Sequence, residues 1–184
     1  MSGARFPKRY ADLAARARVP AGFLAALVCW WLAKPTWTSL LASLPLMLGG
    51  LALRAWAAGH LAKNERLATS GPYAYLRNPL YAGTALLAAG IAVASRRWLA
   101  ALLLAAFFVL AYLPVVEQEE QHLRKLFPQY ESYARRTPRF LPRWRRSGGS
   151  EEHFSWRLYW CNREHHALLA WLAGLLLLAL KTGS

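Results

Sequence analysis

The stretch LYAGTALLAAGIAVASRRWLAALLLAAFFVLAYLPVV, residues 80–116, decides the fold class. It consists of two apolar runs, residues 80–95 and 98–116, which are separated only by Arg96 and Arg97. A helix that crosses a bilayer needs roughly 20 apolar residues, with about 17 as the lower end, so the run 98–116 suits a membrane span as it stands and the run 80–95 does so when Asn78 and Pro79 are included. Because the link between them is so short, we expect the two helices to form a tight antiparallel hairpin.

Three further apolar runs occupy residues 19–33, 40–59 and 167–180. The chain is 56% apolar and only 17% charged, a composition that an ordinary soluble domain of 184 residues does not have. We therefore predict an all-α, polytopic membrane bundle of about five transmembrane helices, with the hairpin as spans three and four. The last run is short, so it either spans the membrane or lies at its interface.

Basic residues are distributed unevenly between the loops. Of the 23 Lys and Arg residues, 18 fall in residues 1–18, 61–79 and 117–166, and four fall in the segments on the other side of the predicted spans. Short loops rich in Lys and Arg stay in the cytoplasm. This asymmetry predicts a cytoplasmic N-terminus, an external C-terminus if all five runs cross, and a multi-pass protein of the bacterial inner membrane.

The net charge of +14 does not indicate nucleic acid as a partner, because the cations lie in short segments between apolar runs rather than in one stripe. Cys29 and Cys161 are the only cysteines, which excludes a disulfide framework. No His residues stand at metal-ligand spacing, so we predict no metal site. We expect membrane lipids around the chain, and the sequence leaves the oligomeric state open.

The cytoplasmic ends of the hairpin carry the polar side chains that suit a binding site. GPYAYLRNPLY, residues 71–81, precedes the first helix, and EQEEQHL, residues 117–123, follows the second. Arg77 supplies a cation there, and Glu119 and Glu120 supply hydrogen-bond acceptors. The alternative is that the acidic cluster is only a solvated continuation of the helix.

Two residues within the predicted spans, Arg54 and Gly83, call for an interpretation. Arg54 is a cation inside a predicted span, where a charge usually has a function. It either holds an anionic group of a ligand or extends to the lipid phosphates. Gly83 is a small residue that suits close helix packing within the hairpin.

Six motifs in order resemble the isoprenylcysteine carboxyl methyltransferase and phospholipid methyltransferase superfamily. They are LALRAW (51–56), LATSGPY (67–73), RNPLYAG (77–83), EEQHL (119–123), LFPQY (126–130) and TPRFLP (137–142). Ordered motifs over residues 50–143 make the match more specific than any single tripeptide.

The resemblance implies a helical membrane enzyme whose cytosolic loops enclose S-adenosylmethionine and whose side opens toward lipid. It implies methyl transfer to a small lipid-like acceptor, either carboxyl O-methylation of the isoprenylcysteine type or phospholipid N-methylation. The positions that match the family's cofactor site are Leu67, Ala68, Tyr73, Arg77, Asn78, Pro79, Tyr81, Glu119 and Glu120. We assign catalytic roles to Arg77 and Glu120, and acceptor binding to Arg54.

The sequence departs from the family at two places. Asn78 stands where the family most often has His, so a role that needs a protonated imidazole is in doubt. Val115 and Val116 stand where prenylcysteine enzymes tend to carry an Arg for the acceptor's carboxylate. The second departure weakens the prenylcysteine assignment and leaves methyl transfer as such unaffected.

We divide the chain into a methyltransferase core, residues 1–143 with the cofactor motifs in 50–143, and a basic and aromatic interfacial segment with the possible fifth helix, residues 144–184. The main rival function is that of a sterol-reductase-like, NADPH-dependent membrane oxidoreductase. Its dinucleotide would need a phosphate-binding turn that the sequence does not show. A noncatalytic membrane scaffold is the second rival.

Overall fold

The computed structural model describes residues 6–142 and 152–183, and the regular structure in these ranges is entirely helical. This confirms the all-α class. The longer helices are α1 (Lys8–Leu32), α2 (Trp37–Ala58), α3 (Pro79–Ser95), α4 (Trp98–Phe107), α5 (Leu113–Leu126) and α8 (His165–Leu180). The short ones are the 3-10 helices η1 (Gly71–Ala74) and η3 (Lys181–Gly183), the π-helix η2 (Phe108–Tyr112), α6 (Tyr130–Arg136) and α7 (Trp156–Cys161). The basic residues 143–146 lie outside the described ranges.

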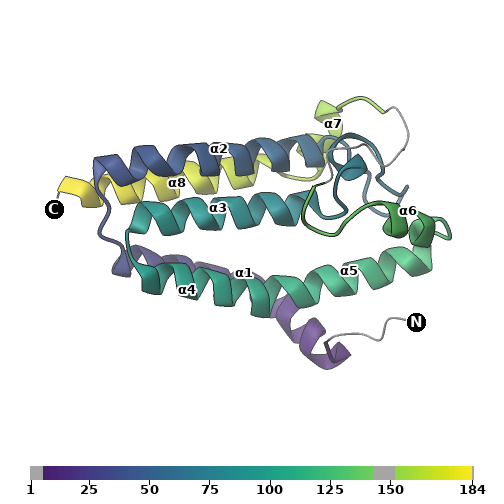
Figure 1. The fold of residues 1–184 in the computed structure, drawn as a ribbon, viewed down its shortest axis with the longest axis horizontal. Helices are drawn as coiled ribbons and strands as arrows, with labels where there is room; N and C mark the ends of the chain where they lie inside the picture. The colour runs from purple at the N-terminus through teal and green to yellow at the C-terminus, as the bar shows by residue number, and fades with distance from the viewer. Residues whose placement is uncertain (1–5, 143–151, 184) are drawn as a thin grey trace.

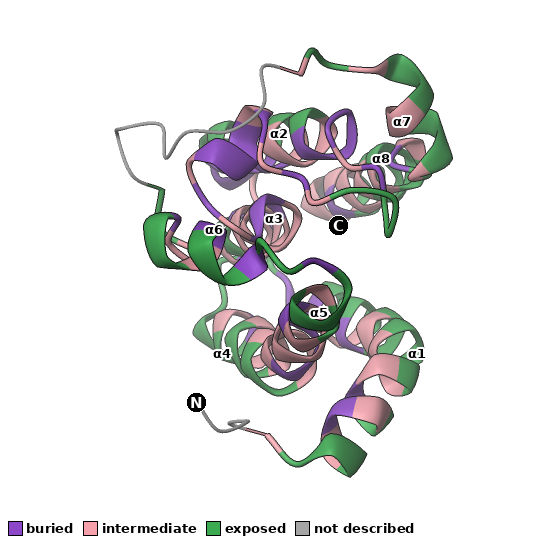
Figure 2. Cartoon of the chain, turned by 90° about the vertical axis from the view of Figure 1, so that its right-hand side faces the viewer, coloured by how far each residue is buried: buried purple, intermediate pink, exposed green. Residues whose placement is uncertain are grey.

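The long helices form two layers (Figure 1). One layer contains α2, α3 and α8, and the other contains α1 and the continuous helix made of α4, η2 and α5. Viewed from the end in Figure 2, the two layers lie above one another, with α3 and α5 toward the middle. Arg96 and Arg97 alone join α3 to α4, which run in opposite directions in different layers.

Close contact between α2 and α3 depends on glycine. A Cβ atom on Gly50 would lie 2.7 Å from the carbonyl oxygen of Gly83, and a Cβ on Gly83 would lie 2.7 Å from that of Gly50. Small residues let membrane helices approach closely in this way. The expectation that Gly83 serves packing inside the α3–α4 hairpin is therefore wrong, because this glycine faces α2.

Three helices are long and apolar enough to cross a membrane: Lys8–Leu32, Trp37–Ala58 and Trp98–Leu126, the last being α4, η2 and α5 together. The apolar helices α3 and α8 are shorter, with 17 and 16 residues. Many large apolar side chains are exposed on the outside of the bundle, including Phe23, Trp31 and Trp98, each more than 70% exposed. A surface of this kind suits contact with lipid.

The loops rich in basic residues gather at one end of the bundle, as Figure 1 shows for the start of α1, the α2–α3 connection and the α5–α6 region. At the opposite end, α1 and α8 meet. The Lys181 ammonium donates to the carbonyl oxygens of Trp30 (2.7 Å) and Trp31 (2.9 Å), and the Trp30 indole donates to the Leu177 carbonyl (3.2 Å). This contact joins the two layers far from the polar loops.

Candidate functional site

A cavity of about 1450 Å³ lies between the two layers. Its polar part is lined by the α2–α3 connection and by α5 and α6, on the side of the basic loops. Its apolar part is lined by α1, α3, α4 and α8, with side chains such as Leu87, Ile91, Trp171 and Leu178. A polar mouth and an apolar chamber therefore share one volume.

The connection that carries Arg77 is fixed by segments far away in the sequence. The Tyr133 hydroxyl of α6 donates to the Tyr73 carbonyl (2.8 Å), and the Arg77 amide donates to the Pro138 carbonyl (2.8 Å). Asn78 occupies the N-cap position of α3 without a capping side-chain hydrogen bond, and Pro79 takes the first helical position that proline favours. Residues 71–79 and 130–139 thus form one structural unit at the mouth of the cavity.

The two adjacent glutamates have different environments. Glu120 is only 5% exposed and receives hydrogen bonds from Asn78 Nδ2 (3.0 Å) and Arg139 Nε (3.2 Å), with an Arg77 guanidinium nitrogen at 3.5 Å. Glu119 lines the cavity and accepts a hydrogen bond from the Tyr81 hydroxyl at 2.8 Å. Glu119 therefore faces a ligand space, whereas Glu120 organises the wall behind it.

Two buried polar atoms at the mouth of the cavity have no hydrogen-bond partner in the described part of the chain, namely Arg77 Nε and the Tyr130 hydroxyl. Both residues line the cavity. Burial raises the pKa of Tyr130 to about 12, so its hydroxyl keeps its proton at neutral pH and remains a donor. Unsatisfied buried donors are costly, which favours a ligand with acceptor atoms at this place.

Eight of the nine residues assigned to the cofactor line this one cavity: Leu67, Ala68, Tyr73, Arg77, Asn78, Pro79, Tyr81 and Glu119. The ninth, Glu120, contacts the cavity only through Asn78 and Arg77. The fold therefore brings these positions together from the α2–α3 connection, α3 and α5. Their roles toward a cofactor stay predictions.

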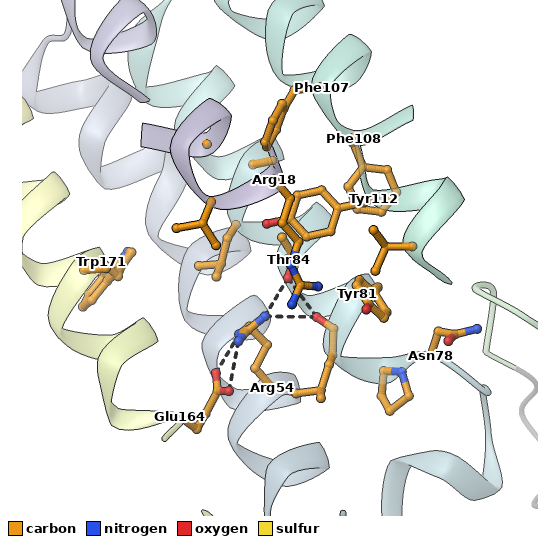
Figure 3. Close-up of a pocket in the computed structure, with 18 of the residues that line it drawn as sticks. Arg18, Arg54, Asn78, Tyr81, Thr84, Phe107, Phe108, Tyr112, Glu164 and Trp171 are labelled. Carbon is orange, nitrogen blue, oxygen red and sulfur yellow. Dashed lines mark hydrogen bonds and ion pairs between the residues drawn. The ribbon is translucent and has the colours of Figure 1, made fainter. Parts of the chain in front are cut away.

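Arg54 also lines the cavity, where it meets a residue that the sequence analysis missed (Figure 3). Its Nε and second guanidinium nitrogen donate to the two carboxylate oxygens of Glu164 at 2.6 and 2.9 Å. Its remaining nitrogen donates to the Thr84 hydroxyl at 2.6 Å. The expected acceptor-binding residue is thus engaged by protein groups on all three nitrogens.

Glu164 and Asn162 show that the C-terminal segment takes part in the site. Asn162 lines the cavity and donates to the carbonyls of Ala58 (3.0 Å) and Leu61 (2.8 Å). The sequence contained one signal for Glu164: an intramembrane arginine needs a counter-ion, and this carboxylate stands directly before the last apolar run. Spacing alone could not show that the two meet.

His60 packs against the outer side of the α2–α3 connection. The His60 Nδ1 lies 3.0 Å from the Ser70 hydroxyl, which donates to Glu152 at 3.4 Å, and the ring packs against Phe154. Burial lowers the pKa of His60, so the neutral imidazole is favoured in the folded protein. Within residues 6–142 and 152–183, no three His, Cys, Asp or Glu side chains come together in a way that could hold a metal ion.

Comparison with known proteins gives a family and two relatives. Residues 50–130 match the family described as phospholipid methyltransferase. The chain is 39% identical over 113 residues to the cobalt-zinc-cadmium resistance protein CzcN of Cupriavidus metallidurans, covering 59% of this chain and 52% of that protein. It is 37% identical over 92 residues to the nickel-cobalt-cadmium resistance protein NccN of Alcaligenes xylosoxydans xylosoxydans, covering 49% of this chain and 43% of that protein.

The chain thus spans about half the length of the curated relatives it matches. No solved structure matches it significantly. The matched segment begins in α2 at Gly50, where α2 approaches α3, and ends at Tyr130 in the wall of the cavity. Residues 50–130 are therefore similar to the phospholipid methyltransferase family, in line with the superfamily that the sequence motifs resemble.

Proposed function

We propose that the chain is an integral membrane methyltransferase that uses S-adenosylmethionine to methylate a small lipid-like acceptor at the cytoplasmic face of the bacterial inner membrane. The observation that carries the proposal is the pair of unpartnered buried donors, Arg77 Nε and the Tyr130 hydroxyl, in the same cavity as the Glu119 carboxylate. An amino-acid headgroup needs donors for its carboxylate and an acceptor for its ammonium. The methionine part of the cofactor is such a headgroup.

The size and polarity of the cavity fit two ligands. Its volume of about 1450 Å³ exceeds the roughly 300–1,000 Å³ of common small-molecule sites. The polar mouth offers the groups that the cofactor needs, and the apolar chamber offers a surface for a hydrocarbon chain. The two ligands would meet where α3 passes from one part to the other, near Tyr81.

The residues of the mouth divide into contact and positioning roles. We expect Arg77 and Tyr130 to hold the cofactor's carboxylate and Glu119 to accept from its ammonium or ribose hydroxyls. Leu67, Ala68 and Leu123 offer apolar contact for a flat adenine ring. Glu120 acts through Arg77 and Asn78, which it holds in place, so its proposed role is to position them.

S-adenosylmethionine, when bound by these residues, would supply an electrophilic methyl group on its sulfonium, and the electron pair of the C–S bond would remain on sulfur. The chain's own contribution is to align the acceptor and exclude water. A carboxylate acceptor is nucleophilic without losing a proton, whereas a protonated amine must first lose one. Glu119, which lines the cavity, is the base that we propose for an amine.

The acceptor's route is through the side of the bundle. Val19, Phe23 and Leu27 of α1 line the cavity and are also at least 60% exposed on the outside, and Leu177 of α8 lines the cavity and is 49% exposed. Hydrogen bonds join α1 to α8 at the end of the bundle that carries Lys181. We therefore propose that lipid-like acceptors reach the chamber between α1 and α8.

The proposed topology has five spans, with the shorter α3 and α8 crossing alongside the three long helices. The polar mouth then faces the cytoplasm with the basic loops around it. For the nicotinamide-dependent alternative, the family match of residues 50–130 offers no support.

Radiolabel transfer tests the reaction. The cofactor, labelled in its methyl group, is incubated with native membranes that contain the protein, and the membranes are then extracted with organic solvent. We expect protein-dependent label in the organic phase. Label released as a volatile product by mild alkali indicates a methyl ester, and alkali-stable label indicates N-methylation. Organic extracts without label would contradict a lipid acceptor.

Calorimetry on the detergent-solubilised protein tests the cofactor site separately. Arg77→Gln and Glu119→Gln each remove a charged partner, so we expect each to weaken binding of S-adenosylmethionine by about 1.5–3 kcal/mol. Glu65→Gln is the control, because Glu65 is exposed and does not line the cavity. Equal affinities in all three variants and the unchanged protein would refute the site.

A further inference from the structure

Arg18 of α1 reaches into the cavity from the layer opposite to Arg54. It is half-buried and lines the cavity together with Gly22 of the next helical turn. The helix contains Pro20, and Figure 1 shows α1 bending along its length. Proline inside a helix removes a backbone hydrogen bond and produces such bends. The first half of α1 therefore turns a basic side chain toward the chamber.

The surroundings of Arg18 are hydroxyl and aromatic groups. Its side chain lies beside Tyr81 (Figure 3). The Tyr81 hydroxyl in turn donates to Glu119 at 2.8 Å. The Tyr112 ring lies edge-on to Tyr81 with centroids 5.9 Å apart, and Phe107 packs against Tyr112 at 5.7 Å. The π-helical turn η2 places Tyr112 there, and π-turns frequently occur at functional sites. Arg18 thus lies where the polar mouth ends and the apolar chamber begins.

The charges in this part of the cavity leave Arg18 without a carboxylate partner. Among the residues that the structure describes, no Asp or Glu oxygen lies within ion-pair distance of its guanidinium, whereas Arg54 is paired in two places with Glu164. A guanidinium stays charged at any physiological pH, and burying it unpaired costs free energy. An anion beside Arg18 would remove this cost.

We propose that Arg18 binds the anionic headgroup of the methyl acceptor, an oxyanion such as a carboxylate or a phosphate at the end of a hydrocarbon chain. This inference rests on the proposed methyltransferase function and specifies its substrate class. The oxyanion accepts from the Arg18 guanidinium, and the hydrocarbon extends into the chamber past Leu87, Ile91 and Leu178. Arg18 on α1 then provides the anion contact that Val115 and Val116 on α5 do not offer.

Two alternatives to an anionic acceptor predict different binding of charged probes. An ammonium amphiphile would use the aromatic rings of Tyr81, Tyr112 and Phe107 through cation–π contact, and Arg18 would repel it. Alternatively, Arg18 extends to the phosphates of bulk lipid and binds no particular ligand. The probes are therefore four amphiphiles with the same twelve-carbon chain: dodecanoate, dodecyl phosphate, dodecanol and dodecyltrimethylammonium.

Equilibrium binding of each radiolabelled probe is measured to the full-length protein in nanodiscs of zwitterionic lipid. We expect dodecanoate or dodecyl phosphate to bind more tightly than dodecanol, and the tighter of the two identifies the kind of headgroup. Arg18→Gln should weaken the anionic probe by roughly ten- to a hundredfold, because a charge-assisted hydrogen bond is lost. Arg18→Lys keeps the charge and should retain part of the affinity.

Arg16→Gln is the matched control. Arg16 lies two positions earlier on the same helix, is exposed and does not line the cavity, so the same loss of charge should leave probe affinity unchanged. Anionic probes that bind Arg18→Gln as tightly as the unchanged protein overturn the proposal, and so does tighter binding of dodecyltrimethylammonium than of both anions.

Calorimetry with S-adenosylmethionine separates this inference from the proposed function. Arg18→Gln should bind the cofactor as the unchanged protein does, which also shows that the variant is folded. If the unchanged protein fails to bind the cofactor while dodecanoate binding depends on Arg18, the methyltransferase function fails and the anion site stands. If instead the unchanged protein binds the cofactor and Arg18→Gln leaves the affinity for dodecanoate unchanged, the anion site fails and the methyltransferase function stands.

Discussion

Arg54, near the C-terminal end of α2, and Glu164, directly before the last helix, form a two-point ion pair across 110 positions of sequence, with distances of 2.6 and 2.9 Å. The side chains are 21% and 7% exposed. The pair ties the C-terminal segment to α2 at the wall of the cavity. The basic and aromatic segment therefore contributes side chains to the wall of the cavity.

Removal of one member of this pair leaves the other charge buried without a partner. We expect Glu164→Gln to lower the free energy of unfolding by about 3 kcal/mol or more, as measured by denaturant titration in detergent. The double variant Arg54→Met with Glu164→Leu should recover much of that loss. Glu131→Gln, which breaks the exposed pair with Arg124, should cost at most about 1 kcal/mol. Equal effects at positions 131 and 164 would contradict the buried pair.

Adjacent glycines in α2 give a matched test of helix packing. A Cβ at Gly50 would lie 2.7 Å from the Gly83 carbonyl oxygen, whereas a Cβ at Gly49 would meet nothing within 4 Å. We expect Gly50→Ala to destabilise the protein by about 1–3 kcal/mol, because α2 and α3 must separate. Gly49→Ala should be neutral or stabilising by up to about 1 kcal/mol, because alanine favours the helix. Thermal unfolding in detergent distinguishes the two.

His60 makes stability depend on pH. Burial lowers its pKa below the ordinary value of about 6.5, so the unfolded chain takes up a proton before the folded one does. The free energy of unfolding should therefore be constant above pH 6.5 and decrease as the pH falls from there toward the lowered pKa. Unfolding midpoints of the unchanged protein and His60→Asn at pH 7.5 and 5.5 measure this. The substitution should reduce the difference between the two pH values.

Reporter fusions test the topology. A reporter active only in the cytoplasm should work when inserted near Gly149 and fail when inserted near Pro35, since the basic loops face the cytoplasm. Activity at Pro35 would reverse the orientation. A reporter fused after Thr182 should be inactive if α8 spans the membrane and active if α8 lies at the cytoplasmic interface.

The apolar runs predicted the positions of α2, α3, α4 and α8 well, because these helices are apolar over most of their length. They missed the first part of α1, which begins at Lys8, and the polar end of α5. The runs at 80–95 and 98–116 correspond to α3 and to α4, η2 and the start of α5. The helix α3 begins at Pro79, directly before the run 80–95. The motifs identified eight residues that the fold brings to one cavity.

Long-range pairing could not be predicted from the sequence. The different environments of Glu119 and Glu120 depend on helical phase, since one turns toward Tyr81 and the other toward Asn78. The position of α3 against α2 depends on backbone contact between Gly50 and Gly83, which is visible only in three dimensions. Arg18 lies in a segment whose basic residues suggested only orientation, because Pro20 can indicate a bend in α1 but not the side toward which the helix bends.

The short last helix has a consequence for the surrounding bilayer. With 16 residues, α8 is about 24 Å long at 1.5 Å per residue, which is less than the roughly 30 Å of an ordinary hydrocarbon core. If α8 crosses the membrane, hydrophobic mismatch must thin the bilayer locally beside it. The headgroups there would descend toward the opening between α1 and α8. An acceptor would then travel a shorter distance from its resting depth to the cavity, so membrane thickness becomes a variable that controls turnover.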